Sequence, residues 1–349
     1  MQTVASIQYL RALSALAVLV FHVMDRRGGG FFIGNAGVDV FFLISGFIMW
    51  MVTCTRETSF KAFMVARLVR IVPAYWIVTL ALVTAGLMAP DVFHQFKTSF
   101  GHILLSLLFV PHLNPAGEAY PVLIPGWTLT FEMFFYVAFG LCLWLVARAR
   151  LWAVTGLLLA LVATGVAVQF GSVALRVYTN PLLLEFLAGL WLGAAWTRRA
   201  LPGRAWGLGL ILLGVLAYVA VVAIPLRAPP GAGNFWRVML WGGPGVLIVG
   251  GALAVEAHGG VPRIRSLLLV GNASYAIYLL HGALITLCFK LLPGAPVAIL
   301  LPVCIAAGVG VGIGFHLWLE LPIARLLRRS LQAAPPAGAP VQGGVALPL

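Results

Sequence analysis

Apolar runs about as long as a bilayer is thick recur along almost the whole chain. A helix that crosses the hydrocarbon core needs roughly 20 apolar residues, because each residue rises about 1.5 Å. The sequence therefore predicts an all-α polytopic membrane protein, a bundle of about ten transmembrane helices. The stretch 102–113 is too short to cross and is expected to lie at an interface or to re-enter. The runs are residues 7–24, 36–55, 71–89, 126–147, 151–170, 180–196, 206–225, 235–255, 267–290 and 295–319.

The composition excludes a soluble domain. Of the 349 residues, 62% are hydrophobic and 9% are charged, whereas about a quarter of a soluble domain is usually charged. The net charge of +13 does not indicate nucleic-acid binding, because the Lys and Arg residues are spread over short connections. No metal site and no bound cofactor is expected, since the four cysteines lie in or beside apolar runs without metal-ligand spacing.

The distribution of positive charge orients the bundle. With a cytoplasmic N-terminus, fourteen Lys and Arg residues, Arg150 among them, fall in cytoplasmic connections, and seven, including Arg237, fall on the other side. Cytoplasmic loops carry the excess of positive charge, so both termini are predicted to be cytoplasmic. Residues 1–331 are expected to form one membrane-embedded domain that begins with a retained signal-anchor helix, and residues 332–349 a disordered cytoplasmic tail.

The first apolar run carries two ionisable residues on one helical face. Eleven steps of about 100° return almost to the same direction, so Arg11 and His22 share a stripe and lie roughly 16 Å apart along the axis. One interpretation is that Arg11 snorkels to the headgroups and His22 sits in the opposite interface, with no function. The other is that both line a cavity, because ionisable residues inside a span usually face a bundle interior and mark a site.

The predicted topology sorts the other polar residues by depth. The outer half holds His22, Asp39, Glu132, Glu185 and His281, from five different helices. If these side chains converge, they form a water-accessible pocket, because isolated carboxylates in lipid are costly.

The inner half holds a different set, which is mostly cationic: Arg11, Arg67, Arg70, His316 and Glu320. A cationic inner mouth suits a ligand that carries phosphate, since the guanidinium fork matches phosphate oxygens. The alternative for Arg67 and Arg70 is that they are ordinary positive-inside signals. Pro73, just after them, is expected to mark the start of a helix.

Five ordered segments resemble one known family. They are RALSALAVLVFH at 11–22, GVDVFFLISGFIM at 37–49, RLVRIVPAYW at 67–76, GWTLTFEMFFY at 126–136 and SYAIYLLH at 274–281. Together they are similar to the integral-membrane acyltransferase-3 family, most of all to its exopolysaccharide-modifying O-acetyltransferase branch. The resemblance implies a ten-helix bundle in the bacterial inner membrane. It also implies transfer of an acyl group, usually acetyl, from cytoplasmic acyl-CoA to a carbohydrate hydroxyl.

The resemblance also carries residue roles. The Arg and His pair of the family falls on Arg11 and His22, its Asp on Asp39, its basic pair on Arg67 and Arg70, and its Trp and Glu on Trp127 and Glu132. Because only a short tail follows the last run, the bundle itself is expected to perform the transfer.

The chemistry of acyl transfer assigns these residues. Histidine suits removal of the alcohol proton near neutral pH, so His22 is the candidate base. Asp39, at the start of the next helix, is expected to hydrogen-bond and orient His22, and Glu132 is a second candidate orienter or base. The predicted catalytic set is thus His22, Asp39 and Glu132, and the predicted donor-binding set is Arg11, Arg67 and Arg70.

The acceptor-binding set is predicted from aromatic and polar residues at similar depth: Trp127, Tyr136, Glu185, Ser274, Tyr278 and His281. Ser274, Tyr278 and His281 share one helical face, which could equally be interhelical hydrogen-bond glue. Trp127 could equally belong to an aromatic interface belt.

These observations predict a membrane-bound O-acyltransferase that uses acetyl-CoA or another acyl-CoA. The predicted acceptor is an exopolysaccharide or its lipid-linked precursor. The polysaccharide biosynthesis machinery is a possible protein partner. A transporter or flippase without covalent chemistry is the alternative from another class, although no inverted repeat of the kind common in transporters is found. A scaffold for a polysaccharide synthase is a third.

Overall fold

The computed structural model describes residues 4–89, 98–168, 170–224 and 233–332. All of their regular structure is helical, with no strand among them. Ten main helices correspond to the ten expected runs: α1 (Ala5–Asp25), α2 (Gly37–Thr53), α3 (Phe60–Met88), α5 (Gly126–Leu141), α6 (Ala147–Ala167), α8 (Leu183–Thr197), α9 (Arg204–Ala223), α11 (Gly243–Ala257), α12 (Arg265–Leu291) and α13 (Val297–Phe315).

Shorter elements connect them. They are a 3₁₀ turn η1 (Phe32–Ala36), the helices α4 (Phe100–Leu107), α7 (Val173–Tyr178), α10 (Gly233–Arg237) and α14 (Leu321–Gln332), and two π-helical segments, η2 (Val238–Gly242) and η3 (His316–Glu320).

Nine helical stretches in the described part of the chain are long and apolar enough to cross a membrane. The tenth main helix, α5, has 16 residues and lies in the core of the bundle. The prediction of a polytopic helical membrane protein is therefore confirmed. The stretch 102–113 contains α4, which has eight residues and cannot span.

Two boundaries differ from the expected ones. Pro73 lies inside α3 and does not start it, so that prediction was wrong; the helix begins at Phe60, where the hydroxyl of Ser59 accepts a hydrogen bond from the backbone N–H of Ala62. At the C-terminal end, α13 continues through η3 into α14, which ends at Gln332. The predicted disordered tail beyond that residue lies outside the described residues, as do Lys97 and Arg227 of the charge count. The sidedness of the termini stays a prediction.

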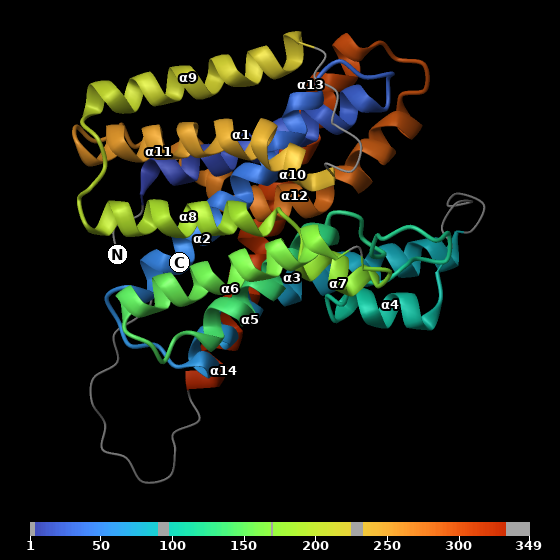
Figure 1. Ribbon diagram of the computed structural model, residues 1–349. Helices are drawn as coiled ribbons and strands as arrows, with labels where there is room; N and C mark the ends of the chain where they lie inside the picture. Colours follow the sequence, from blue (N-terminus) through green and yellow to red (C-terminus); the bar gives the residue numbers. More distant parts are fainter. Residues whose placement is uncertain (1–3, 90–97, 169, 225–232, 333–349) are drawn as a thin grey trace.

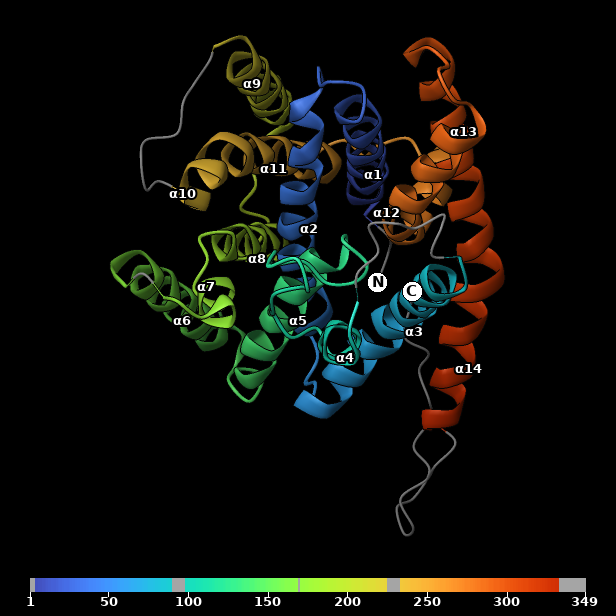
Figure 2. The same cartoon turned by 90° about the vertical axis from the view of Figure 1, so that its right-hand side faces the viewer.

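Helix α2 runs through the middle of the bundle (Figure 2), and α8 packs against it with the two backbones close together. A Cβ atom at Gly46 would lie 2.0 Å from the carbonyl oxygen of Phe186, and one at Gly189 would lie 1.9 Å from that of Leu43. Only glycine permits this approach of two backbones. In Figure 1, α8, α11 and α9 form successive rows, while α4 and α7 both lie toward the right-hand end of the molecule.

Two charged side chains satisfy backbone groups at helix ends. The Glu256 carboxylate accepts hydrogen bonds from the N–H groups of Ala5 (2.8 Å) and Ser6 (2.7 Å), the first residues of α1. Acidic groups are favourable there because helix N-termini carry unpaired N–H groups.

Arg150 does the converse at helix C-termini. Its Nη1 donates to the carbonyl of Thr53 (3.2 Å), at the end of α2, and its Nη2 donates to the carbonyls of Leu143 (3.4 Å) and Leu145 (2.9 Å), just after α5. Arg150 therefore joins two helix ends. From the sequence it was counted only as a positive charge in a cytoplasmic connection, and this role was not predicted.

Arg150→Lys should lower the thermal stability of the purified protein, because one ammonium cannot reach three carbonyls from two segments. Each buried carbonyl left without a partner costs about 1–3 kcal/mol. The matched control is Arg148→Lys, because Arg148 lies two residues away and is exposed. Equal melting temperatures for the two variants would contradict the bridging role.

Candidate active site

A cavity of about 90 Å³ lies among α1, α2, α3, α5 and α12. We call it the cationic pocket, because three arginines line it. Seven of the twelve predicted site residues meet there: Arg11, Arg67, Arg70, Glu132, Tyr136, Ser274 and Tyr278. Arg11 is 7% exposed, so it faces the bundle interior and does not snorkel to the headgroups.

The charges of this pocket are not balanced within the protein. No carboxylate among the described residues forms an ion pair with Arg11, Arg67 or Arg70. The Arg67 Nε is buried without a hydrogen-bond partner, and the Oγ of Ser274 is likewise unpartnered. Buried cations without partners are strongly unfavourable. Arg11 donates one hydrogen bond, from Nη1 to the Oε1 of Gln8 (3.3 Å), which is neutral and leaves its charge uncompensated. The pocket is therefore a candidate site for an anionic group.

Glu132 supplies the one carboxylate of the pocket. Its Oε1 accepts hydrogen bonds from the Oγ of Ser45 (2.9 Å), on α2, and from the hydroxyl of Tyr136, one turn further along α5. Glu132 thus lies with the arginines and not with the other residues assigned to the outer half.

His22 lies beside His281, with ring centroids 4.8 Å apart. The Nδ1 of His22 is 2.9 Å from the carbonyl oxygen of Val18. A carbonyl only accepts, so Nδ1 carries the hydrogen and Nε2 keeps its lone pair in the neutral ring. His281 is 2% exposed, and its Nδ1 donates to the carbonyl of Tyr278 (2.5 Å).

This histidine pair adjoins the cationic pocket without lining it. The ring of His281 lies 5.6 Å from that of Tyr278. The hydroxyl of Tyr278 is 3.2 Å from that of Thr128, and both residues line the pocket. A row of polar side chains therefore runs from His22 to the pocket.

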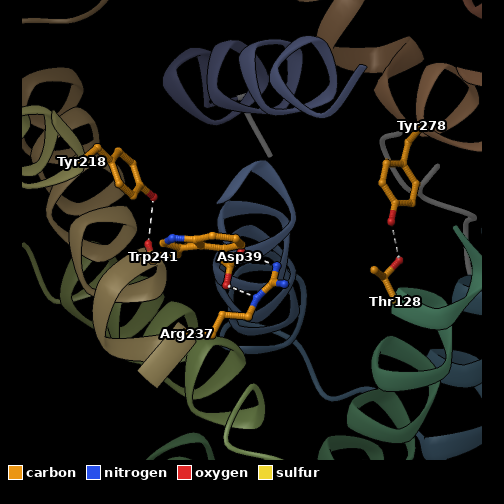
Figure 3. Close-up of polar contacts among 6 residues, drawn as sticks. All are labelled: Asp39, Thr128, Tyr218, Arg237, Trp241 and Tyr278. Atoms are coloured by element: carbon orange, nitrogen blue, oxygen red, sulfur yellow. Dashed lines mark hydrogen bonds and ion pairs between the residues drawn. The ribbon is translucent and has the colours of Figure 1, made fainter. Parts of the chain in front are cut away.

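Asp39 does not orient His22, and that prediction was wrong. Its carboxylate, 0% exposed, accepts two hydrogen bonds from Arg237, from Nε to Oδ1 (3.0 Å) and from Nη2 to Oδ2 (2.7 Å). The Arg237 guanidinium also lies 4.7 Å from the Trp241 ring and 5.8 Å from the Trp127 ring. Figure 3 shows the Asp39–Arg237 pair, with Thr128 and Tyr278 on the other side of α2.

The reason for the correction is local. The π-helical segment η2 continues α10 toward α2 and brings Arg237, counted as a loop charge, beside Asp39. A planar guanidinium then binds both carboxylate oxygens, a stronger arrangement than one imidazole contact.

Glu185 adjoins this second cluster, where it interacts electrostatically with Asp39 and Arg237. It is 1% exposed, and neither of its carboxylate oxygens has a hydrogen-bond partner among the described residues. The single pocket considered for the five outer residues therefore does not form. They lie in three places: Glu132 in the cationic pocket, His22 with His281, and Asp39 with Glu185. Trp127 lines another cavity, and His316 binds Glu320 (2.9 Å) within η3.

Sequence reasoning missed three contributors: Arg237, Ser45 and Tyr275, of which the last two line the cationic pocket. Ser45 stands next to Gly46 in an apolar run, and this pair marks where a helix approaches closely. The sequence did not single out Arg237, because one arginine at the start of the apolar run 235–255 fits the positive-inside count of loop charges. Among the described residues, no group of three or more His, Cys, Asp or Glu side chains could hold a metal.

The geometry defines a polytopic membrane protein with a cationic pocket inside its bundle. The chain belongs to the acyltransferase-3 family, whose acyltransferase domain matches residues 4–318, and it is a multi-pass membrane acyltransferase.

Two relatives illustrate the range of the family. The exopolysaccharide production protein ExoZ of Rhizobium meliloti (strain 1021) is 39% identical over 315 residues, which cover 88% of this chain and 95% of ExoZ. The peptidoglycan O-acetyltransferase OatA of Listeria monocytogenes serovar 1/2a (strain ATCC BAA-679 / EGD-e) is 28% identical over 113 residues, which cover 31% of this chain and 17% of OatA. No solved structure matches the chain.

The Asp39–Arg237 assignment can be tested by a double-mutant cycle on thermal stability. Asp39→Asn or Arg237→Gln alone should each destabilise the protein, because breaking a buried ion pair costs about 3–5 kcal/mol. The double variant should lose much less than the sum, since the two side chains act as a unit. Asp39→Asn combined with His22→Ala is the control, and its losses should add. Additive losses for the first pair would contradict the assignment.

Proposed function

We propose that this membrane acyltransferase moves an acetyl or other short acyl group from acyl-CoA to a carbohydrate hydroxyl, in an exopolysaccharide or its lipid-linked precursor. The likeness to ExoZ over 88% of the chain supports a polysaccharide acceptor, and the printed activity of OatA supports O-acetylation. The three unpaired guanidinium groups of the cationic pocket carry the proposal, because they call for a negatively charged donor.

The donor would approach from the side of the bundle that holds Arg67 and Arg70. Guanidinium forks bind phosphate oxygens in pairs, and acyl-CoA carries its phosphates at the far end of a flexible arm from the thioester. A pocket of about 90 Å³ has room for the acyl end of that arm, because a water molecule takes about 30 Å³ of liquid. The nucleotide would then stay at the mouth, on the bacterial cytoplasmic side that the charge count predicts.

In the reaction, the acceptor oxygen attacks the thioester carbon. The C–O bond forms, the C–S bond breaks, the hydroxyl proton passes to a base and the thiolate leaves as CoA. The Nε2 of His22, with its free lone pair, is the proposed base. Glu132, held by Ser45 and Tyr136, is the second candidate, and it would act from within the pocket.

His22→Ala should abolish acyl transfer and leave acyl-CoA binding unchanged, because the imidazole lies outside the cationic pocket. Loss of a general base commonly lowers the rate by about 10²–10⁴-fold. The measurement is transfer of radiolabelled acetyl from acetyl-CoA to deacetylated polysaccharide by purified protein. His258→Ala, at an exposed histidine, is the matched control. Normal turnover by His22→Ala would move the base role to Glu132.

Arg67→Lys and Arg70→Lys should each weaken acetyl-CoA binding about tenfold or more, because lysine keeps the charge and loses the bidentate fork. Turnover at saturating donor should change much less. Calorimetric titration of acetyl-CoA into the purified variants measures this. The control is Arg56→Lys, at an exposed arginine outside the pocket. Unchanged affinities would contradict a donor-binding role and would favour the alternative that both arginines only set the membrane orientation.

A further inference from the structure

A second and larger cavity, of about 390 Å³, is lined by residues of α4 and α7, which lie toward one end of the bundle (Figure 1). Its walls come from α4, the connection 108–125, the first turns of α5, α7 and α10. We call it the distal cavity. Its polar lining includes Tyr120, Trp127, Thr130, Asn180, Asn234 and Arg237.

The two cavities differ in charge. The cationic pocket has three arginines against one carboxylate. The distal cavity has a single formally charged lining residue, Arg237, which is already neutralised by its two hydrogen bonds to Asp39. Amide, hydroxyl and imidazole groups make up the rest of its polar surface. The distal cavity therefore suits a neutral ligand with many hydroxyl groups and not a phosphate-bearing one.

The aromatic residues of the distal cavity suit the same ligand. Trp127 and Tyr120 line it, and such rings combine an apolar face with a polar edge. Trp127 is fixed by edge contacts with Phe42 (ring centroids 6.3 Å apart) and Phe131 (5.9 Å). A rigid indole beside amides and a guanidinium provides a flat apolar surface for a sugar ring and donors and acceptors for its hydroxyls.

Two side chains in this cavity, Arg237 and Asn234, have hydrogen-bonding groups that no described residue uses. Arg237 uses Nε and Nη2 for Asp39, and no described residue accepts a hydrogen bond from its Nη1. The side chain of Asn234 is exposed and has no hydrogen bond to the described residues. Asp39 thus acts as a positioning residue, which holds Arg237 at the cavity wall.

A thin wall separates the two cavities. Phe42 lines the cationic pocket, and it contacts Trp127 and Phe131, which line the distal cavity. Helix α5 turns Thr128 and Glu132 to one cavity and Trp127 and Thr130 to the other. A ligand in the distal cavity is therefore one layer of side chains away from the pocket assigned to the donor.

We propose that the distal cavity is the acceptor site, in which Trp127, Asn234 and Arg237 bind a neutral sugar unit of the polysaccharide. This inference rests on the proposed acyl transfer to carbohydrate. It names where the acceptor binds and which chemical class of sugar fits.

The test measures the apparent KM for donor and for acceptor separately with purified full-length protein. The donor is acetyl-CoA, and the acceptor is oligosaccharide prepared from the cells' own polysaccharide after alkaline removal of esters. Asn234→Trp fills the cavity and Tyr120→Ala removes one aromatic wall. Each should raise the acceptor KM about tenfold, the change that the loss of one or two good contacts brings, with the donor KM unchanged. Asn272→Trp, at an exposed asparagine outside both cavities, is the control.

The outcomes are distinguishable. If the wild type transfers no acetyl group to the oligosaccharide, the proposed function fails. If the wild type is active and both cavity variants keep its acceptor KM, the acceptor site lies elsewhere. A rise in donor KM for Asn234→Trp would also overturn the assignment.

A salt series tests the chemical class. Exposed charge interactions are screened beyond about 10 Å at 0.1 M salt and about 3 Å at 1 M. The donor KM should therefore rise severalfold with added KCl, while the acceptor KM stays within about twofold. An acceptor KM that rises in parallel with the donor KM would exclude a neutral sugar.

Discussion

A charge inside an apolar bundle must find a partner, and the partners of the buried charges organise this protein. Arg150 binds the last carbonyl of α2 and a carbonyl just after α5, Glu256 binds the first N–H groups of α1, and Arg237 binds Asp39. The contacts of Arg150 with Thr53, of Glu256 with α1 and of Arg237 with Asp39 join segments far apart in the sequence. The helices are apolar over most of their surface, so such contacts fix their register and their rotation in a way that hydrophobic burial alone does not.

The exceptions to this rule mark the site. Arg11, Arg67 and Arg70 lie in one pocket without an acidic partner within ion-pair distance among the described residues. Arg11 is buried and the other two are half-buried, so their positive charge is costly without a counter-charge. Glu185, near Asp39, is also buried without a hydrogen-bond partner among the described residues, so the lack of a partner marks both the cationic pocket and the surroundings of Asp39.

Helix α5 divides the polar interior between two environments. One of its faces turns Thr128, Glu132 and Tyr136 toward the cationic pocket, and another turns Trp127 and Thr130 toward the distal cavity. A transferase must bind two substrates of different chemistry and bring them together. Two cavities of different charge on either side of one short helix separate two kinds of binding surface, with the layer of Phe42, Trp127 and Phe131 between them.

The sequence by itself determined the helical class and the number of main helices, because hydrophobic run length and helical periodicity are local properties. Seven of the predicted site residues line the cationic pocket, although Glu132 was expected in the outer half and the arginines in the inner half. Only the tertiary structure decided the partner of Asp39 and the separation of the five outer residues into three places. Depth along a span is encoded in the sequence, but the rotation of one helix relative to its neighbours depends on contacts between distant segments. The contact between Arg237 and Asp39, just before the π-helical segment η2, is one example, and no local sequence pattern predicts it.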